Sequence, residues 1–268
     1  MHQEYIQAIT AKAEANDWIR AVWLEGSFGR GTADRYSDLD FHFLLAKTDI
    51  ESFKADVESW LSTIQPLVLS TLLFDGKLVN ALTVEGLRVD IVLHTEDVVQ
   101  IDPSKGRVLI NKGADIQLDS DARSVEPSPV IPILEQQTRE FWRCIALLPS
   151  VVGRNELIAG CMGLSIEATI LTNIIIAGYG IVRDRGAKNL NQFLPPDAHQ
   201  SIETALSMQG LSPATLAEAH LGLARIMQKY GRSIAEKHQY AYPNNLEESV
   251  LRYVNRELAL LSLQNFGH

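Results

Sequence analysis

The residues best suited to chemistry are two aspartates at the start of an apolar, strand-like segment, residues 38–46. Asp38 and Asp40 are two positions apart, so on a strand both carboxylates leave the same face, about 7 Å apart along the chain. Two such carboxylates repel each other unless a cation lies between them, and their oxygens suit Mg²⁺ together with a substrate phosphate. His42 shares this face, and we expect it to be a packed or partly exposed neighbour.

A third aspartate, Asp90, interrupts the apolar run of a second strand-like segment, residues 87–94. A lone carboxylate in such a run is costly to bury. If the two strands are neighbours, Asp90 completes a three-carboxylate cluster with Asp38 and Asp40. A metal held there would bridge substrate phosphates, and one carboxylate would accept the proton of an attacking hydroxyl.

A candidate phosphate site precedes the aspartates. The turn Gly26-Ser27 follows the apolar segment 19–24, and small residues at a strand end let backbone amides approach an anion. The Ser27 hydroxyl adds a donor, and Arg30, one turn further on, can bind the same oxygens. Each feature alone has an ordinary structural explanation, but their combination in one strand–turn–strand segment favours a functional site.

A predicted mixed sheet positions these residues. Helical periodicity favours helices over residues 1–16 and 49–64. Apolar or alternating runs favour strands over residues 19–24, 38–46, 67–74, 77–84 and 87–94. Residues 115–132 are acidic and polar and contain three prolines, and we interpret them as a linker.

The second half is predicted to be entirely helical. Apolar residues recur at helical spacing over residues 133–148, 155–182, 196–208, 213–238 and 245–263, which predicts a helical bundle. The predicted fold class is therefore α+β, with a mixed-sheet domain over residues 1–118 and a helical domain over residues 119–268.

Composition excludes several classes of protein. The 268 residues are 46% hydrophobic and 21% charged, which excludes a disordered or fibrous chain. The net charge is −9, nearly all of it in the first half, and such a surface disfavours binding of a nucleic-acid polymer. Two cysteines, Cys144 and Cys161, without metal-ligand spacing exclude a disulfide framework. With no signal peptide over residues 1–16, we expect a cytoplasmic protein.

One segment, residues 157–182, is apolar and long enough to span a bilayer. Glu167 is its only charged side chain. It also contains four glycines, and no second segment like it exists. We therefore expect no membrane span but a helix buried between domains or subunits. Glu167 is then either a buried structural carboxylate or a base contributed across a subunit interface.

The order of these motifs resembles a known signature. Gly26-Ser27, ten residues, then Asp38-x-Asp40, with an acidic residue on a later strand, is similar to the DNA polymerase β-like nucleotidyltransferase superfamily. Residues 24–45 most resemble small antibiotic nucleotidyltransferases, the kanamycin-type aminoglycoside enzymes and the LinB-type lincosamide enzymes. The resemblance continues more weakly through about residue 238.

This resemblance implies a function. Mg²⁺ would be bound by Asp38, Asp40 and Asp90, and the nucleotide phosphates by the Gly26-Ser27 turn. A nucleoside monophosphate, AMP from ATP, would move to a hydroxyl of a small molecule, plausibly an antibiotic. Some relatives carry Glu where this chain has Asp40 or Asp90, which leaves the identity of the base open.

The resemblance also implies features of the second half. In the basic cluster of residues 183–188, Lys188 stands at a position where relatives contact phosphate, although a helix C-terminus would also explain the cluster. Relatives act as dimers, so we expect a homodimer in which the apolar segment 157–182 forms contacts. Asp or Arg at Ile175 would then weaken association and activity, whereas in a monomeric bundle the same change would unfold the chain.

Two other functions stay open at this point. One is a nucleotidyltransferase of a toxin–antitoxin or regulatory system that modifies a protein or a nucleotide. The other is a non-catalytic nucleotide-binding module, against which the complete set of three aspartates argues. The acceptor also stays open, because an acidic cleft favours a cationic aminoglycoside while the layout of the chain favours a lincosamide.

Overall fold

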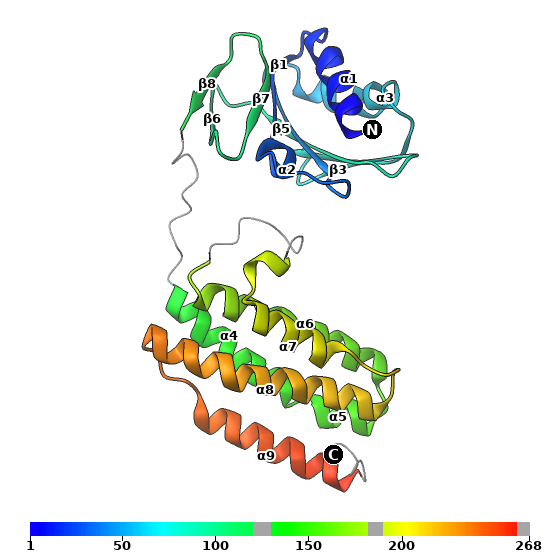
Figure 1. Ribbon diagram of the computed structural model, residues 1–268. Coiled ribbons are helices and arrows are strands. Elements are labelled where there is room, and N and C mark those ends of the chain that lie inside the picture. The colour runs from blue at the N-terminus through cyan, green and yellow to red at the C-terminus, as the bar shows by residue number, and fades with distance from the viewer. Residues whose placement is uncertain (120–129, 182–189, 262–268) are drawn as a thin grey trace. The chain divides into compact units, whose positions relative to one another are not determined.

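The computed structural model describes residues 1–119, 130–181 and 190–261. The chain divides into two compact units, Met1–Glu126 and Pro127–His268, which are described separately (Figure 1). A mixed sheet lies in the first unit and a set of helices in the second, which confirms the predicted α+β class. Catalysis by residues 1–118 and substrate binding by residues 119–268 remain predictions.

A six-stranded sheet forms the centre of the first unit, in the order β3-β4-β5-β2-β1-β7. Only β2 and β5 pair in parallel, while the other neighbours are antiparallel. The strands are β1 (Ile19–Leu24), β2 (Leu39–Leu45), β3 (Leu67–Leu73), β4 (Leu78–Thr83), β5 (Arg88–His94) and β7 (Arg107–Asn111). The five strands predicted from the sequence are present, with bounds that differ by at most one residue.

One face of this sheet carries the apolar core. Helices α1 (His2–Glu14) and α3 (Ile50–Ser62) pack on it, on the same side of the sheet (Figure 1). Alternate residues of the strands point toward these helices, because side chains on a strand alternate between faces. The core on this side includes Ile6, Ile9, Phe41, Phe43, Phe53 and Trp60.

The opposite face carries the polar alternate residues of β2, Asp40 and His42. A small parallel sheet of β6 (Val98–Ile101) and β8 (Asp115–Leu118) covers part of it. A second, smaller core lies there, formed by Ala21, Trp23, Leu44, Val99, Ile101 and Ala114. The face that packs against α1 and α3 therefore stabilises the unit, whereas the opposite face presents carboxylates.

Three sequence predictions about the first unit need correction. Strands β6, β7 and β8 were not predicted, and residues 115–132 are not a plain linker, because β8 occupies 115–118 and helix α4 begins at Val130. Strands β6 and β8 have four residues each, too few to show periodicity, and they pair with each other across the intervening strand β7. The Gly26-Ser27 turn is also a short helix, α2 (Gly26–Gly29).

The second unit is a helical bundle, as predicted. Its helices are α4 (Val130–Ile145), α5 (Leu148–Gly153), α6 (Leu157–Gly178), α7 (Pro196–Leu206), α8 (Pro213–His238) and α9 (Asn244–Leu260), with a 3₁₀ turn, η1 (Leu190–Phe193). The helix predicted over 133–148 is α4, which ends at Ile145, and the short helix α5 that follows it is not predicted from the sequence. Pro149 lies in the first turn of α5, where proline is tolerated but cannot continue a preceding helix.

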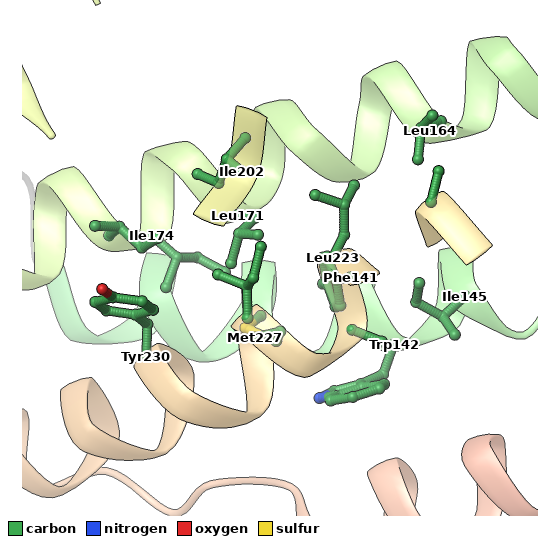
Figure 2. Close-up of a cluster of buried hydrophobic side chains, with 14 of the residues drawn as sticks. Phe141, Trp142, Ile145, Leu164, Leu171, Ile174, Ile202, Leu223, Met227 and Tyr230 are labelled. Carbon is green, nitrogen blue, oxygen red and sulfur yellow. The ribbon is translucent and has the colours of Figure 1, made fainter. Parts of the chain in front are cut away.

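Large side chains from α4, α6, α7 and α8 fill the centre of this bundle (Figure 2). Two glycines let α6 and α8 approach closely. A Cβ at Gly178 would lie 2.6 Å from Ile234, and one at Gly160 would lie 2.1 Å from Leu216 Cδ2. The buried residues labelled in the figure are Phe141, Trp142, Ile145, Leu164, Leu171, Ile174, Ile202, Leu223, Met227 and Tyr230.

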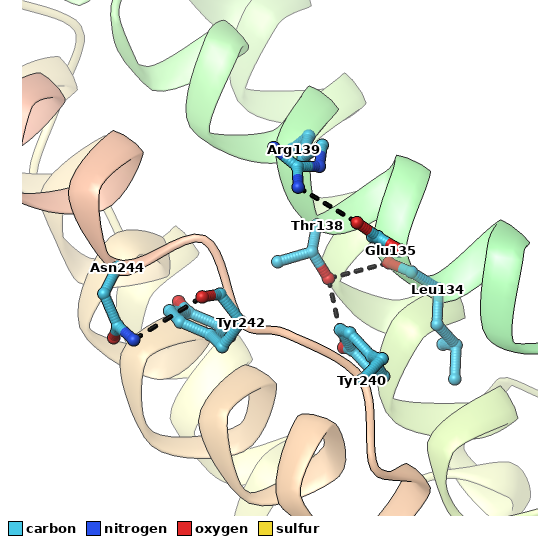
Figure 3. Close-up of polar contacts among 7 residues, drawn as sticks. All are labelled: Leu134, Glu135, Thr138, Arg139, Tyr240, Tyr242 and Asn244. Carbon is cyan, nitrogen blue, oxygen red and sulfur yellow. Dashed lines mark hydrogen bonds and ion pairs between the residues drawn. The ribbon is translucent and has the colours of Figure 1, made fainter.

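Hydrogen bonds fasten the segment between α8 and α9 to α4 (Figure 3). The Thr138 hydroxyl donates to the Leu134 carbonyl at 2.7 Å and lies 3.3 Å from the Tyr240 hydroxyl. The indole N–H of Trp142 donates to the Tyr242 hydroxyl at 3.1 Å. These contacts give the buried polar atoms of α4 their partners, as a buried polar group requires.

Glu167 lies inside the bundle, with 1% of its surface exposed. Its Oε2 is 2.6 Å from His220 Nδ1, and His220 Nε2 is 3.2 Å from the Gly160 carbonyl. Burial raises the pKa of Glu167, and the hydrogen bond with His220 opposes that rise. This environment matches a buried structural carboxylate rather than a base that meets a substrate.

Within the described ranges, α6 is the one helix whose length and composition would allow it to cross a membrane. Its second half packs in the bundle core, where Ile174 and Ile175 are fully buried. Its first half keeps Ile158, Met162 and Ile166 largely exposed. The sequence prediction that Ile175 meets a second subunit is therefore corrected, because Ile175 belongs to its own bundle.

We predict opposite effects for two substitutions on α6. Ile175→Asp should lower the free energy of unfolding by about 3 kcal/mol or more, because a carboxylate enters an apolar core without a partner. Met162→Asp, at a side chain that is 64% exposed, should change it by only about 0.5 kcal/mol. Urea denaturation followed by circular dichroism measures both. Wild-type stability in the Ile175 variant would contradict this account of the core.

Candidate active site

Three carboxylates meet on the polar face of the sheet. Asp38 immediately precedes β2, Asp40 lies on β2, and Asp90 lies on β5. The parallel pairing places Asp40 and Asp90 directly opposite each other, and one oxygen from each of the three residues lies within 4.8 Å of the others. The sequence predicted this cluster only on condition that the two strands were neighbours, and the structure meets that condition.

The donor set of this cluster fits a hard divalent cation. Asp38 is 9% exposed, and Asp40 and Asp90 are half-buried. Carboxylates this close and this shielded repel one another, and a cation among them relieves the repulsion. All three offer oxygen atoms, the ligands that Mg²⁺ prefers. The cluster could therefore hold Mg²⁺, and one of its carboxylates could accept a proton.

Gly26 is required by its contact with Asp40. Its φ is +61°, in the left-handed region that disfavours residues with a Cβ. A Cβ built there would lie 1.8 Å from Asp40 Oδ2, and the preceding backbone N–H, of Glu25, donates to the Asp40 carbonyl at 3.0 Å. The loop and the carboxylate therefore lie directly against each other.

Ser27 and Arg30 follow on the same turn. In the part of the chain that the structure describes, the buried Ser27 hydroxyl has no hydrogen-bond partner. A buried polar atom without a hydrogen bond destabilises the folded protein by about 1–3 kcal/mol. A hydrogen bond to a ligand oxygen would offset this cost. Arg30 follows α2 as its C-cap, and its backbone N–H donates to the Gly26 carbonyl at 3.2 Å. The orphaned hydroxyl beside the carboxylates fits a phosphate group.

Asn80 is a site residue that the sequence analysis missed. It lies on β4 directly opposite Asp90, and its Nδ2 donates to Asp90 Oδ1 at 2.6 Å. This bond fixes the orientation of the Asp90 carboxylate within the cluster. The sequence contains a signal for this pairing, because Glu85-Gly86 suits a tight turn between the two strands, and that turn sets the register in which Asn80 pairs with Asp90.

The loop that presents Asp38 is also held in place. The backbone N–H of Tyr36 donates to Asp34 Oδ1, and that of Asp34 donates to the Ser37 hydroxyl, both at 2.9 Å. The hydrogen bond from the Tyr36 backbone lowers the pKa of Asp34 most, and the hydrogen bond from the Ser37 side chain lowers it further. From β5, the Arg88 guanidinium donates to the Tyr36 carbonyl at 3.0 Å.

Two predicted residues are not part of this site as described. Lys188, with the rest of the basic cluster 183–188, lies outside the described residues. Glu167 belongs to the helical unit, where His220 holds it. The structure brings together Asp38, Asp40 and Asp90, with the turn of Gly26, Ser27 and Arg30 beside them, and the catalytic and nucleotide-binding roles of these residues remain predictions.

The sequence matches the streptomycin adenylyltransferase family over residues 1–257. The chain belongs to this family. The match spans nearly the whole chain, includes every residue of the carboxylate cluster, and confirms the resemblance to antibiotic nucleotidyltransferases. The protein is therefore an enzyme of the nucleotidyltransferase class. No curated protein matches the chain.

Three solved structures have chains similar to this one. An aminoglycoside 6-adenyltransferase from Bacillus subtilis is 18% identical, with a TM-score of 0.45 over 95% of this chain and 96% of that one. A CdnE cyclic dinucleotide synthase from Elizabethkingia meningoseptica is 13% identical, with a TM-score of 0.30 over 97% and 91%. A CdnE c-di-GMP synthase from Capnocytophaga granulosa is 14% identical, with a TM-score of 0.32 over 87% and 81%.

We predict that Gly26→Ala abolishes nucleotide transfer, because the new Cβ must displace the Asp40 carboxylate. Gly31→Ala is the matched control, since Gly31 also has a positive φ, +72°, but a Cβ there meets nothing within 4 Å. Both variants should lose about 1–2 kcal/mol of stability from backbone strain. Steady-state kinetics and thermal unfolding separate the two effects. Equal activity in both variants would contradict the importance of the Gly26–Asp40 contact.

We also predict that Asn80→Leu lowers kcat about tenfold, because losing a hydrogen bond to a charged group is unfavourable by about 1.5 kcal/mol. The KM for nucleotide should change less, since the change acts on the orientation of Asp90. Initial-rate kinetics at saturating Mg²⁺ measure both constants. A kcat equal to that of the wild type would show that Asp90 needs no partner on β4.

Proposed function

We propose that the protein transfers AMP from ATP, with Mg²⁺, to a hydroxyl group of a small molecule. The observation that carries this proposal is the cluster of Asp38, Asp40 and Asp90, against which the Gly26 loop lies without a side chain between them. A metal and a nucleotide phosphate could therefore share one site. Membership of the streptomycin adenylyltransferase family supports transfer of an adenylyl group.

The chain's own residues would divide the reaction among them. Asp38, Asp40 and Asp90 would hold Mg²⁺, which when bound neutralises charge on the phosphate oxygens. The Ser27 hydroxyl and the Arg30 guanidinium would bind and orient the phosphates. The acceptor oxygen attacks the α-phosphorus in line, a new O–P bond forms, and pyrophosphate leaves.

A carboxylate of the same cluster would take the proton of the acceptor hydroxyl. Asp90 is suited to this role, because Asn80 holds one of its oxygens at 2.6 Å and so fixes the direction of the other. Asp40 is the alternative, and its Oδ2 lies against the Gly26 loop.

We propose an aminoglycoside as the acceptor. The family is named for a streptomycin adenylyltransferase, and streptomycin is a cationic molecule with several hydroxyl groups. The net charge of −9, most of it in the unit that carries the cluster, attracts a cationic acceptor. A lincosamide, a protein or a second nucleotide as acceptor would instead appear as another outcome of the test below.

Three further points belong to the same proposal. Lys188 is proposed to contact the phosphates, so Lys188→Ala would raise the KM for nucleotide more than that for the acceptor.

A homodimer is proposed, supported by the exposed apolar side chains of Ile158, Met162 and Ile166 on α6, and light scattering would give a mass above the 29.8 kDa of one chain. The protein is proposed to act in the cytoplasm.

The test is a panel of acceptors incubated with Mg²⁺ and ATP, with pyrophosphate release and product mass as readouts. We expect one acceptor class to gain the mass of an adenylyl group, which is AMP less one water. Asp38→Asn and Asp40→Asn should each lower turnover at least about 100-fold, since each removes a metal-binding charge. Asp56→Asn is the matched control, because Asp56 is exposed on α3, which packs on the other face of the sheet. Equal turnover in all variants would overturn the metal assignment.

A further inference from the structure

The sheet face that carries the carboxylates continues beyond Asp90 onto β4 and the edge strand β3. Residues directly opposite each other on neighbouring strands share a face, and this pairing leads from Asp90 to Asn80 and from Asn80 to Thr71. Neighbouring strands lie about 4.8 Å apart, so the line from β5 to β3 is about 10 Å long. We call Asp90, Asn80 and Thr71 the polar row.

Apolar side chains flank the polar row on both sides. Two residues away along the strands in one direction, Leu78 of β4 pairs with Leu73 of β3. Two residues away in the other direction, Leu82 pairs with Leu69. A separation of two residues keeps these side chains on the same face as the row. Leu69 and Leu73 are exposed, and Leu78 and Leu82 are half-buried. We call these four residues the leucine borders.

Other elements occupy the rest of this face. The core of the small β6–β8 sheet includes Trp23 of β1 and Leu44 of β2, but no residue of β3 or β4, which the structure describes in full. Arg88, opposite Leu82 on β5, donates to the Tyr36 carbonyl ahead of β2, so its guanidinium is directed toward β2. The polar row and the leucine borders therefore form one strip over β4 and β3.

The strip and the candidate phosphate loop lie on opposite sides of the carboxylate cluster. The loop follows β1, and β1 flanks β2 on the side away from β5. In an in-line transfer, the attacking oxygen and the leaving group lie on opposite sides of the phosphorus. With the phosphates held at the loop, this geometry favours an acceptor that lies over β5 and β4.

The side chains of the strip suit a ring that carries hydroxyl and amine groups. Asn80 uses one N–H on Asp90, and its amide also has an acceptor oxygen and a second N–H. The Thr71 hydroxyl both donates and accepts. The leucine borders offer hydrocarbon to the C–H faces of such rings. A nucleobase would instead favour aromatic side chains on which to stack, and the strip contains only aliphatic ones.

We propose that this strip is the acceptor subsite of the enzyme. Thr71 and Asn80 bind polar groups of the acceptor, and Leu69 and Leu73 pack against its rings. The inference rests on the proposed function, whose chemical step it leaves unchanged. The acceptor oxygen bonds to the α-phosphorus, its proton passes to a carboxylate of the cluster, and pyrophosphate leaves.

Neighbouring residues of β3 provide a matched pair of variants. Leu73 and Leu72 are 40% and 42% exposed, so either can be replaced at a similar cost in burial. Leu73 pairs with Leu78 on the face of the strip, whereas Leu72 pairs with the buried Val79 on the opposite face. Leu73→Gln is therefore the test variant, and Leu72→Gln is its control.

A second pair tests the hydroxyl group of the polar row. Thr71→Val removes it and keeps the shape of the side chain. Ser70→Ala is the control, because Ser70 pairs with the buried Ala81 and so lies on the opposite face.

The measurement is calorimetric binding of streptomycin to the protein loaded with Mg²⁺ and α,β-methylene ATP, which cannot release pyrophosphate. We expect Leu73→Gln and Thr71→Val each to weaken streptomycin binding about fivefold, as the loss of one contact would. Both controls should stay within about twofold of the wild type. The affinity for α,β-methylene ATP should be the same in all four variants.

The outcomes distinguish this inference from the proposed function. Equal streptomycin affinity in test and control variants overturns the subsite and leaves the proposed function standing. Weaker binding of α,β-methylene ATP in the test variants assigns the strip to the nucleotide and also overturns the subsite. A wild-type protein that binds the nucleotide analogue but no streptomycin overturns the subsite and the proposed acceptor, while transfer of AMP stands. A wild-type protein that binds no nucleotide overturns the proposed function itself.

Discussion

The parallel pairing of β2 with β5 is the contact on which the rest of the candidate site depends. It sets Asp40 opposite Asp90 and so concentrates negative charge at one position of the sheet. Like charges so close oppose folding, and their placement persists because the other face of the same two strands is buried against α1 and α3. Stability gained by Phe41, Phe43 and Ile91 on one face thereby holds the carboxylates in place on the other.

Small and polar neighbours then adapt the surroundings to that charge. Gly26 leaves room for the Asp40 carboxylate, and Asn80 donates to Asp90. The indole N–H of Trp23 donates to a further carboxylate, that of Glu25, which precedes the Gly26 loop. Each of these contacts brings a donor or an open space to an acidic group, as expected where several carboxylates must be ionised together to bind a cation.

In the helical unit, the apolar helix α6 is packed against its neighbours together with one carboxylate, that of Glu167. Glycines at 160 and 178 let α8 approach α6, and His220 on α8 supplies the partner for Glu167. Removal of either partner would leave a buried polar group unsatisfied, which is more unfavourable than the pair itself is favourable. The exposed apolar residues at the start of α6 form the one part of that helix which this packing leaves open.

Much of this protein could be read from local pattern. The strands from β1 to β5 alternate or run apolar over six or seven residues. The segment from Gly26 to Asp40 contains most of the candidate site, so the spacing of its residues indicated the site. The second half showed helical periodicity, but α6 is apolar on all sides, and periodicity could not tell that Ile175 points inward and Met162 outward. Strands β6 and β8 are too short to show a period, and the residues of β8 were interpreted as the start of a linker. Asn80 meets Asp90 across a hairpin, whereas Asp40 meets Asp90, and His42 meets His94, because β2 pairs with a strand about 50 residues further along the chain. Such pairing is decided by hydrogen bonding between backbones and by the burial of a shared face, which are properties of the folded chain and of no single segment.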